Sequence, residues 1–110
     1  MHSQTDMVVV GAGPAGSYAA LTAAKMGVEV VVCEEHREVG VPCHCPGHIS
    51  IRGLDKCELH VPEKIIENRI RGAVFYSPSG NEFRVKLSSP VTYVINRALF
   101  DKHLVELAER

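Results

Sequence analysis

The sequence has no long hydrophobic run, no excess of charge of either sign and no low-complexity segment. The longest apolar run near the start, Met7 to Val10, ends in glycine, so nothing approaches a membrane-spanning helix or the apolar part of a signal peptide. Twelve basic and 13 acidic side chains give a net charge of -1, and the basic residues are dispersed, which argues against a nucleic-acid-binding surface. We therefore expect a cytosolic protein that binds no nucleic acid.

The composition excludes further classes. With 110 residues, of which 45% are hydrophobic and 23% charged, the chain resembles ordinary folded domains, so intrinsic disorder and fibrous folds are excluded. Four cysteines without an export signal favour buried thiols, metal ligands or residues beside a redox cofactor over disulfides. Cys43, Cys45 and Cys57 fall in one region of the chain.

The first third of the sequence predicts a βαβ unit. Valine-rich runs at 7–10 and 28–33 predict two parallel strands, the first of them buried on both faces. Between them, Pro14 suits the first turn of an alanine-rich helix over 15–26, and Gly27 suits a left-handed end of that helix. We expect the crossover to be right-handed.

The rest of the sequence is less periodic. Residues 35–62 predict an ordered loop with one short helix near 49–54. The segments 69–76 and 82–87 flank a turn that contains proline and glycine, which predicts an antiparallel hairpin. A short strand at 92–95 and a final amphipathic helix follow, and the apolar positions of that helix are Leu99, Phe100, Leu104, Leu107 and Ala108.

Gly11, Gly13 and Gly16 form a G-x-G-x-x-G string between the first strand and the helix. This is the context that the dinucleotide-binding fingerprint requires. Gly11 permits the tight turn, Gly13 lets the backbone approach a pyrophosphate, and Gly16 allows the helix to pack closely on the strand. The N-terminus of the helix would meet the phosphate charge.

Glu34 follows the second strand directly, where an acidic residue can accept hydrogen bonds from ribose hydroxyls. Its carboxylate would repel a 2′-phosphate, so the position favours an ADP moiety with a free ribose over NADP. The spacing does not distinguish FAD from NAD. The alternative is that the turn serves packing alone and that Glu34 is a solvated strand end. In either case we expect His36 to be a solvated loop residue.

Three cysteines and three histidines lie between residues 43 and 60, which raises the alternative of a tetrahedral zinc site in a small non-enzymatic module. Cys43 and Cys45 enclose a single residue, however, whereas structural zinc ligands are usually paired across two to four residues. We therefore predict no metal and interpret the loop as a cofactor contact.

The Gly-Pro-Ala-Gly form of the turn resembles the two-dinucleotide-binding flavoprotein superfamily, in which the first βαβ unit holds FAD. Through most of its length the chain resembles the geranylgeranyl reductase family of flavoproteins, which includes archaeal enzymes that saturate the prenyl chains of digeranylgeranyl glycerophospholipids. The further matches occur in the order Gly40, Pro42 and Cys45, then Ile49-Ser50, then Arg52-Gly53-Leu54, then Arg97, Phe100-Asp101-Lys102 and Leu104.

The resemblance implies a role for several residues at an FAD site. Beside Gly11, Gly13 and Gly16 of the cofactor-binding turn, the implied contacts are Ala15 at the pyrophosphate, Glu34 at the ribose, Cys45, Pro46 and His48 at the flavin, and Arg97 at FAD. Cys45 is also the candidate catalytic residue, although a free thiol there can be a mere packing group. The sequence departs from the family after Cys45, because Pro46 has no N–H to donate, and Cys43 is an extra thiol.

The resemblance also implies the activity: an FAD-dependent oxidoreductase that reduces C=C bonds of geranylgeranyl chains in archaeal-type membrane lipid biosynthesis. It implies an isoprenoid lipid substrate and an external electron donor. An aromatic-ring monooxygenase of the same fold, and nucleotide binding without catalysis, remain alternatives. Peripheral membrane contact is left open.

The expected fold is α/β: the N-terminal βαβ of a Rossmann-like FAD-binding domain with an inserted β-hairpin and a C-terminal helix. A doubly wound sheet needs more than two parallel strands, and two alone leave exposed edges through which the chain could self-associate. We therefore expect residues 1–110 to be the N-terminal part of an FAD-binding domain, incomplete and inactive alone, with the remainder of the family's chain absent.

Overall fold

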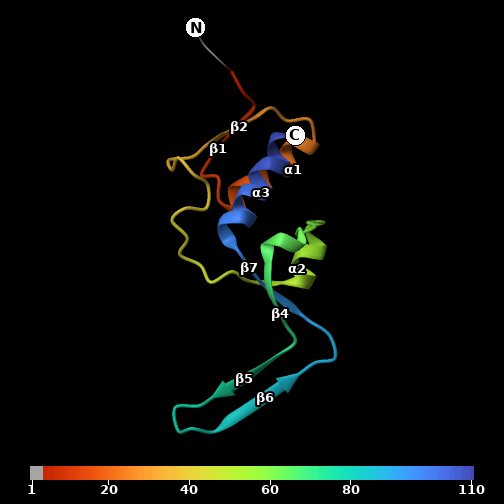
Figure 1. Cartoon of the computed structure of the whole chain (residues 1–110). Helices are drawn as coiled ribbons and strands as arrows, with labels where there is room; N and C mark the ends of the chain where they lie inside the picture. The colour runs from red at the N-terminus through yellow and green to blue at the C-terminus, as the bar shows by residue number, and fades with distance from the viewer. Residues whose placement is uncertain (1–3) are drawn as a thin grey trace. The chain divides into compact units, whose positions relative to one another are not determined.

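The structure is a computed structural model that describes residues 4–110 (Figure 1). These residues form two compact units. Unit 1 contains the described residues up to His44 together with residues 97–110, and unit 2 contains Cys45–Asn96. Unit 2 is therefore inserted into unit 1 along the chain.

Unit 1 is a βαβ motif with one added helix. Strand β1 (Met7–Val10), helix α1 (Pro14–Lys25) and strand β2 (Val30–Cys33) follow one another, and β1 pairs with β2 in parallel from Met7↔Val30 to Val10↔Cys33. Helix α3 (Arg97–Glu109) packs against α1. The sequence prediction of a parallel βαβ unit is confirmed.

The ends of α1 explain why this segment is helical. Pro14 occupies the first turn, where its missing N–H leaves no hydrogen bond unmade. Gly27 has a φ of 84°, the left-handed conformation that ends a helix. Between these ends, Ser17, Ala20 and Leu21 are buried, and Phe100 and Leu104 of α3 complete the core of unit 1.

The prediction that β1 is buried on both faces is wrong for this chain. Val8 and Val10 are exposed, and Val10 keeps 86% of its surface accessible. The sheet formed by β1 and β2 contains two strands only, and in unit 1 the helix α1 contacts both of them. A strand needs a layer on each face to be fully buried, and within residues 4–44 and 97–110 only one face is covered.

Unit 2 contains an antiparallel sheet in the order β3-β7-β4. Its strands are β3 (His48–Ser50), β4 (Ile66–Ile70) and β7 (Thr92–Ile95). Helix α2 (Ile51–Lys56) and a 3₁₀ turn at Glu63–Ile65 lie in the chain between β3 and β4. The buried apolar residues of this unit are Leu54, Val61, Ile65 and Ile95.

Two boundaries differ from the sequence prediction. The expected loop contains the strand β3, which is too short to show a period and depends on pairing with β7. The expected strand at 69–76 is broken at Arg71, so that residues 66–70 pair with β7 while Gly72–Tyr76 forms β5. Strand β5 pairs with β6 (Glu82–Lys86), which confirms the hairpin.

The helices of residues 4–110 are all too short or too polar to cross a membrane.

Candidate functional site

The glycine turn joins β1 to α1. A side chain would have no room at Gly16 but ample room at Gly13. Gly11 has a φ of 102°, which favours glycine. A Cβ at position 16 would lie 2.0 Å from the carbonyl oxygen of Gly11, so the close packing expected of Gly16 is present. A Cβ at position 13 would meet no heavy atom within 4 Å, so the backbone at Gly13 is open to an approaching ligand.

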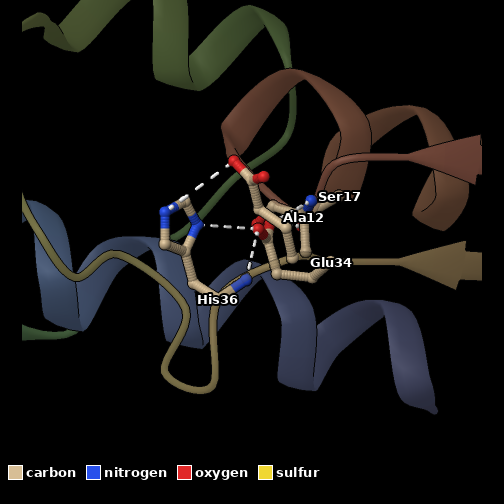
Figure 2. A network of polar contacts seen from close by, with 5 residues as sticks. Ala12, Ser17, Glu34 and His36 are labelled. Carbon is tan, nitrogen blue, oxygen red and sulfur yellow. Dashed lines mark hydrogen bonds and ion pairs between the residues drawn. The ribbon is translucent and has the colours of Figure 1, made fainter.

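Glu34 reaches back to this turn. The parallel register places Val10 opposite Cys33, and the N–H of Gly11 donates to the carbonyl of Cys33 at 2.7 Å, so Glu34 follows β2 at the same edge where the turn follows β1. The N–H of Ala12 donates to Oε2 of Glu34 at 2.7 Å (Figure 2). A carboxylate is thus fixed against the middle of the glycine turn.

His36 is the second partner of that carboxylate. Its Nδ1 lies 3.0 Å from Oε1 of Glu34, and its backbone N–H donates to the same oxygen at 3.2 Å (Figure 2). His36 is exposed, as expected of a solvated loop residue, and it also binds this carboxylate, which was not predicted. Its position two residues after an acidic strand end was the available signal, since such residues can hydrogen-bond back to the carboxylate.

These contacts determine the charge of Glu34. The hydrogen bond from Ala12, followed by those from His36, lowers the pKa of Glu34 from 4.5 to about 2. Glu34 is therefore an anion at neutral pH, with both oxygens oriented by donors. Such a group accepts hydrogen bonds from hydroxyls and repels phosphate.

An open cavity of about 440 Å³ begins at Glu34 and Ala12. Its walls come from α1, β2 and α3 and are mostly small or apolar, and the one buried hydroxyl in it, that of Ser17, donates to the carbonyl of Ala12 at 3.1 Å. The cavity therefore combines a mostly small or apolar wall with two carboxylates, Glu34 and Glu109, which suits a ligand that has both an apolar face and hydrogen-bond donors.

Arg97 is the first residue of α3 and belongs to unit 1. Its Nε and Nη2 donate to the two carboxylate oxygens of Asp101, one helical turn later, at 2.9 and 3.3 Å. Asp101 is buried, so this pair fixes the guanidinium at the start of the helix. Ala15, in the first turn of α1, is exposed.

Cys45, Pro46 and His48 belong to unit 2, whereas the other predicted site residues belong to unit 1. The N–H of Gly47 donates to the Sγ of Cys45 at 3.4 Å, and the Nε2 of His48 shares a hydrogen bond of 2.6 Å with the hydroxyl of Thr92. Cys45, Pro46 and His48 are exposed.

Gly47 is a residue of this loop that sequence reasoning missed. It has a φ of 87°, and a Cβ there would lie 2.1 Å from the carbonyl oxygen of Ile95. The loop therefore lies directly on β7. A glycine that follows a proline was the available signal, because this pair marks a turn that needs a positive φ.

The zinc alternative finds no ligand set in the part of the chain that the structure describes. No group of three or more His, Cys, Asp or Glu side chains there lies close enough to hold a metal ion. The cysteines of the described residues are also free of disulfides.

Comparison with known proteins identifies the relatives of this fold. Residues 6–43 match the family described as FAD dependent oxidoreductase. Digeranylgeranylglycerophospholipid reductase 2 of Methanopyrus kandleri is 44% identical over 100 residues, which are 91% of this chain and 24% of that protein. The corresponding reductase 1 of Methanococcoides burtonii is 40% identical over 111 residues, 98% of this chain and 27% of that protein. The resemblance to the geranylgeranyl reductase family is confirmed.

A solved structure supports the same conclusion. A geranylgeranyl bacteriochlorophyll reductase-like protein from Thermoplasma acidophilum superimposes with a TM-score of 0.90 at 36% identity, over 96% of this chain and 28% of that chain. The α/β architecture and FAD as the cofactor are thereby confirmed, and the proteins that this chain resembles are FAD-dependent oxidoreductases. The chain spans about a quarter of the length of the geranylgeranyl reductase relatives that it matches.

Proposed function

We propose that residues 1–110 form the N-terminal part of the FAD-binding domain of a flavoprotein that reduces C=C bonds of geranylgeranyl chains in archaeal-type membrane lipids. The observation that carries the FAD site is Glu34, whose carboxylate is held against the open glycine turn by the N–H of Ala12. The lipid substrate and the external electron donor are inferred from the names of the similar reductases.

The residues present fit the ADP half of FAD. The open backbone at Gly13 and the free N–H groups at the start of α1 suit the pyrophosphate. The ionised carboxylate of Glu34 suits the ribose hydroxyls, since an anion accepts such hydrogen bonds more strongly than a neutral group. Its negative charge also selects against a phosphorylated ribose.

The flavin half of the site would draw on Cys45, Pro46, His48 and Arg97. FAD supplies the hydride chemistry when it is bound, and the protein supplies position and exclusion of water. The pair with Asp101 fixes the Arg97 guanidinium, so a cation is available without a further loss of side-chain freedom. Pro46 can contribute only packing and a carbonyl, because it has no N–H.

Cys45 is assigned a packing role at the flavin. Its Sγ accepts a hydrogen bond from the N–H of Gly47, which orients the side chain. A thiol beside a flavin then acts as a small packing group, and removal of the sulfur by Cys45→Ala should change the rate of reduction less than removal of the guanidinium by Arg97→Ala.

The experiment is a calorimetric titration of the chain with ADP and with FAD, using Glu34→Gln and the matched control Glu35→Gln. Glu35 is adjacent and almost fully exposed, so it tests charge alone. We expect Glu34→Gln to weaken both ligands about tenfold, because hydrogen bonds to a charged group are lost, and Glu35→Gln to leave them unchanged. Equal behaviour of the two variants would remove Glu34 from the site.

The activity itself is tested on the full-length protein. Its absorption spectrum should show a bound flavin, and the reduced protein should saturate a geranylgeranyl lipid in the absence of oxygen. Oxygen-dependent hydroxylation of an aromatic ring would replace this proposal by the monooxygenase alternative. Stoichiometric zinc without flavin would contradict it altogether.

A further inference from the structure

The β5–β6 hairpin exposes three aromatic residues that the flavin site does not use. Phe75 is 56% exposed, Tyr76 68% and Phe83 64%, although these three are half of the six aromatic residues of the chain. Phe75 and Phe83 face each other across the strands with ring centroids 6.0 Å apart. Within residues 4–110 neither strand pairs with any third strand, so the sheet itself gives these rings no cover (Figure 1).

The turn beyond these aromatic residues satisfies several of its own polar groups. Its residues from Ser77 to Asn81 close on themselves: the N–H of Ser77 donates to the carbonyl of Asn81 at 2.8 Å, and the N–H of Gly80 to the carbonyl of Ser77 at 3.0 Å. The Ser77 hydroxyl accepts from the N–H of Asn81 at 3.1 Å and shares a 2.9 Å hydrogen bond with Ser79. These groups can leave water without losing those partners, which lowers the cost of entering a region of low dielectric.

The end of the hairpin is uncharged, and charged residues lie on either side of it along the strands. Residues 72–81 contain no charged side chain, whereas Arg71, Arg84 and Lys86 lie next to them along the hairpin. The one acid among residues 71–87, Glu82, is paired with Arg84 at 3.1 Å. The hairpin is thus locally cationic in a chain whose net charge is -1.

We propose that the β5–β6 hairpin docks the protein on an anionic lipid surface. Phe75, Tyr76 and Phe83 enter the interface together with the uncharged turn, and Arg71 and Lys86 bind the anionic headgroups. Aromatic side chains favour the boundary between headgroups and hydrocarbon, and basic residues beside them add electrostatic attraction. The proposal takes from the proposed function only the inference that the substrate is a membrane lipid, which gives such docking a purpose.

This charge pattern favours lipid over a protein partner. A second copy of the chain would present the same cationic strands and would repel the first at this surface. A lipid surface is soft, apolar below the headgroups and anionic above them, which complements both the rings and the basic residues. We therefore treat a dimer as an outcome of the test.

The chain has no tryptophan, so a single one can report on the hairpin. Tyr76→Trp should show a blue-shifted emission when phosphatidylglycerol vesicles are added, and quenching when the vesicles contain brominated acyl chains. Phosphatidylcholine vesicles should give a much smaller change. Met26→Trp, at an exposed position beyond α1 in unit 1, is the matched control and should respond to neither.

Sedimentation with phosphatidylglycerol vesicles tests the residues themselves. Lys86→Gln should weaken vesicle binding about fivefold, whereas Lys25→Gln, an exposed lysine at the end of α1, should not change it. Phe83→Ser should weaken it further, and circular dichroism reports whether that variant keeps its fold. Because the Lys86 variant leaves the aromatic pair intact, it tests docking even where the Phe83 variant unfolds.

Three outcomes would overturn the proposal: no binding to anionic vesicles, binding that the hairpin substitutions leave unchanged, or a dimer in light scattering that Phe83→Ser abolishes. FAD titration of the same variants separates this proposal from the proposed function. Lys86→Gln should bind FAD normally. Loss of FAD binding with intact vesicle binding would contradict the proposed function and leave the docking surface standing.

Discussion

At the scale of single residues, the arrangement around Glu34 matters most. The sequence predicted that Glu34 directly follows the second strand. Strand β2 does end at Cys33, so that prediction is correct. The contact with His36 is local and had a signal in the sequence, whereas the N–H of Ala12 could not be predicted as a partner, because it comes from a turn 22 residues earlier in the chain. A carboxylate that is held on both oxygens is a pre-oriented acceptor.

The pKa of Glu34 gives a prediction about pH. A carboxyl whose pKa falls from 4.5 in the unfolded chain to about 2 in the folded protein stabilises the fold fully above pH 4.5, and this contribution disappears as pH falls toward 2. We expect His36→Ala to raise the pKa of Glu34, measured by the carboxyl carbon shift in an NMR titration. An unchanged pKa would show that the His36 contacts are absent in solution.

Gly16 and Gly13 form a matched pair. Gly16→Ala would place a methyl group 2.0 Å from a backbone oxygen, so we expect a loss of about 1–3 kcal/mol in the free energy of unfolding, measured with urea. Gly13→Ala meets open space and should cost less than about 1 kcal/mol. Its effect should appear instead in a weaker affinity for ADP. Equal stability of the two variants would contradict the close packing at Gly16.

At the scale of elements, hydrophobic periodicity predicted the longer helices and strands. It failed for a strand that forms only because it pairs with another strand. Strand β1, helix α1, strand β7 and helix α3 were predicted almost to the residue, because each has a clear apolar pattern and an end signal. Strand β3 has three residues and no period of its own. It exists because β7 offers a hydrogen-bonding edge, which is a fact of tertiary structure.

Gly47 and Gly53 allow the β3–β7 contact to be tested. Gly47→Ala puts a methyl group 2.1 Å from the carbonyl oxygen of Ile95 at a φ of 87°, so it should destabilise unit 2 and speed hydrogen exchange at the N–H of Ile95, which donates to Gly47 at 2.9 Å. Gly53→Ala lies within α2 and meets only ordinary contacts, so it should stabilise by about 0.5–1 kcal/mol. Opposite signs are the expected result.

At the scale of the whole molecule, the sheet of unit 1 has one open face among the described residues. The sequence indicated a sheet that needs more parallel strands, and the structure shows β1 and β2 as a sheet of two. Val8 and Val10 share one face of β1 and are exposed. Which residues would cover them could not be read from the sequence, because burial depends on partners outside these strands.

This open sheet predicts self-association. A strand with an unpaired edge and an exposed apolar face pairs readily with another copy, so the chain alone should show a mass in light scattering that rises with concentration. Val8→Lys should suppress the rise, because a charge on that strand disfavours pairing. Met26→Lys adds the same charge away from the sheet and should not. A monomer at all concentrations would contradict the prediction.

The bond between the N–H of Ile95 and the carbonyl of Gly47 also bears on the order of folding. It ties together the two ends of unit 2, and the chain returns to unit 1 directly after Asn96. Closing a long loop is entropically unfavourable, and the penalty grows with the number of residues that remain free. Once unit 2 has folded, almost none of its residues count as free, so α3 can find α1 as though the intervening chain were a short connection. Folding of the nucleotide-binding unit should therefore wait for the unit inserted into it.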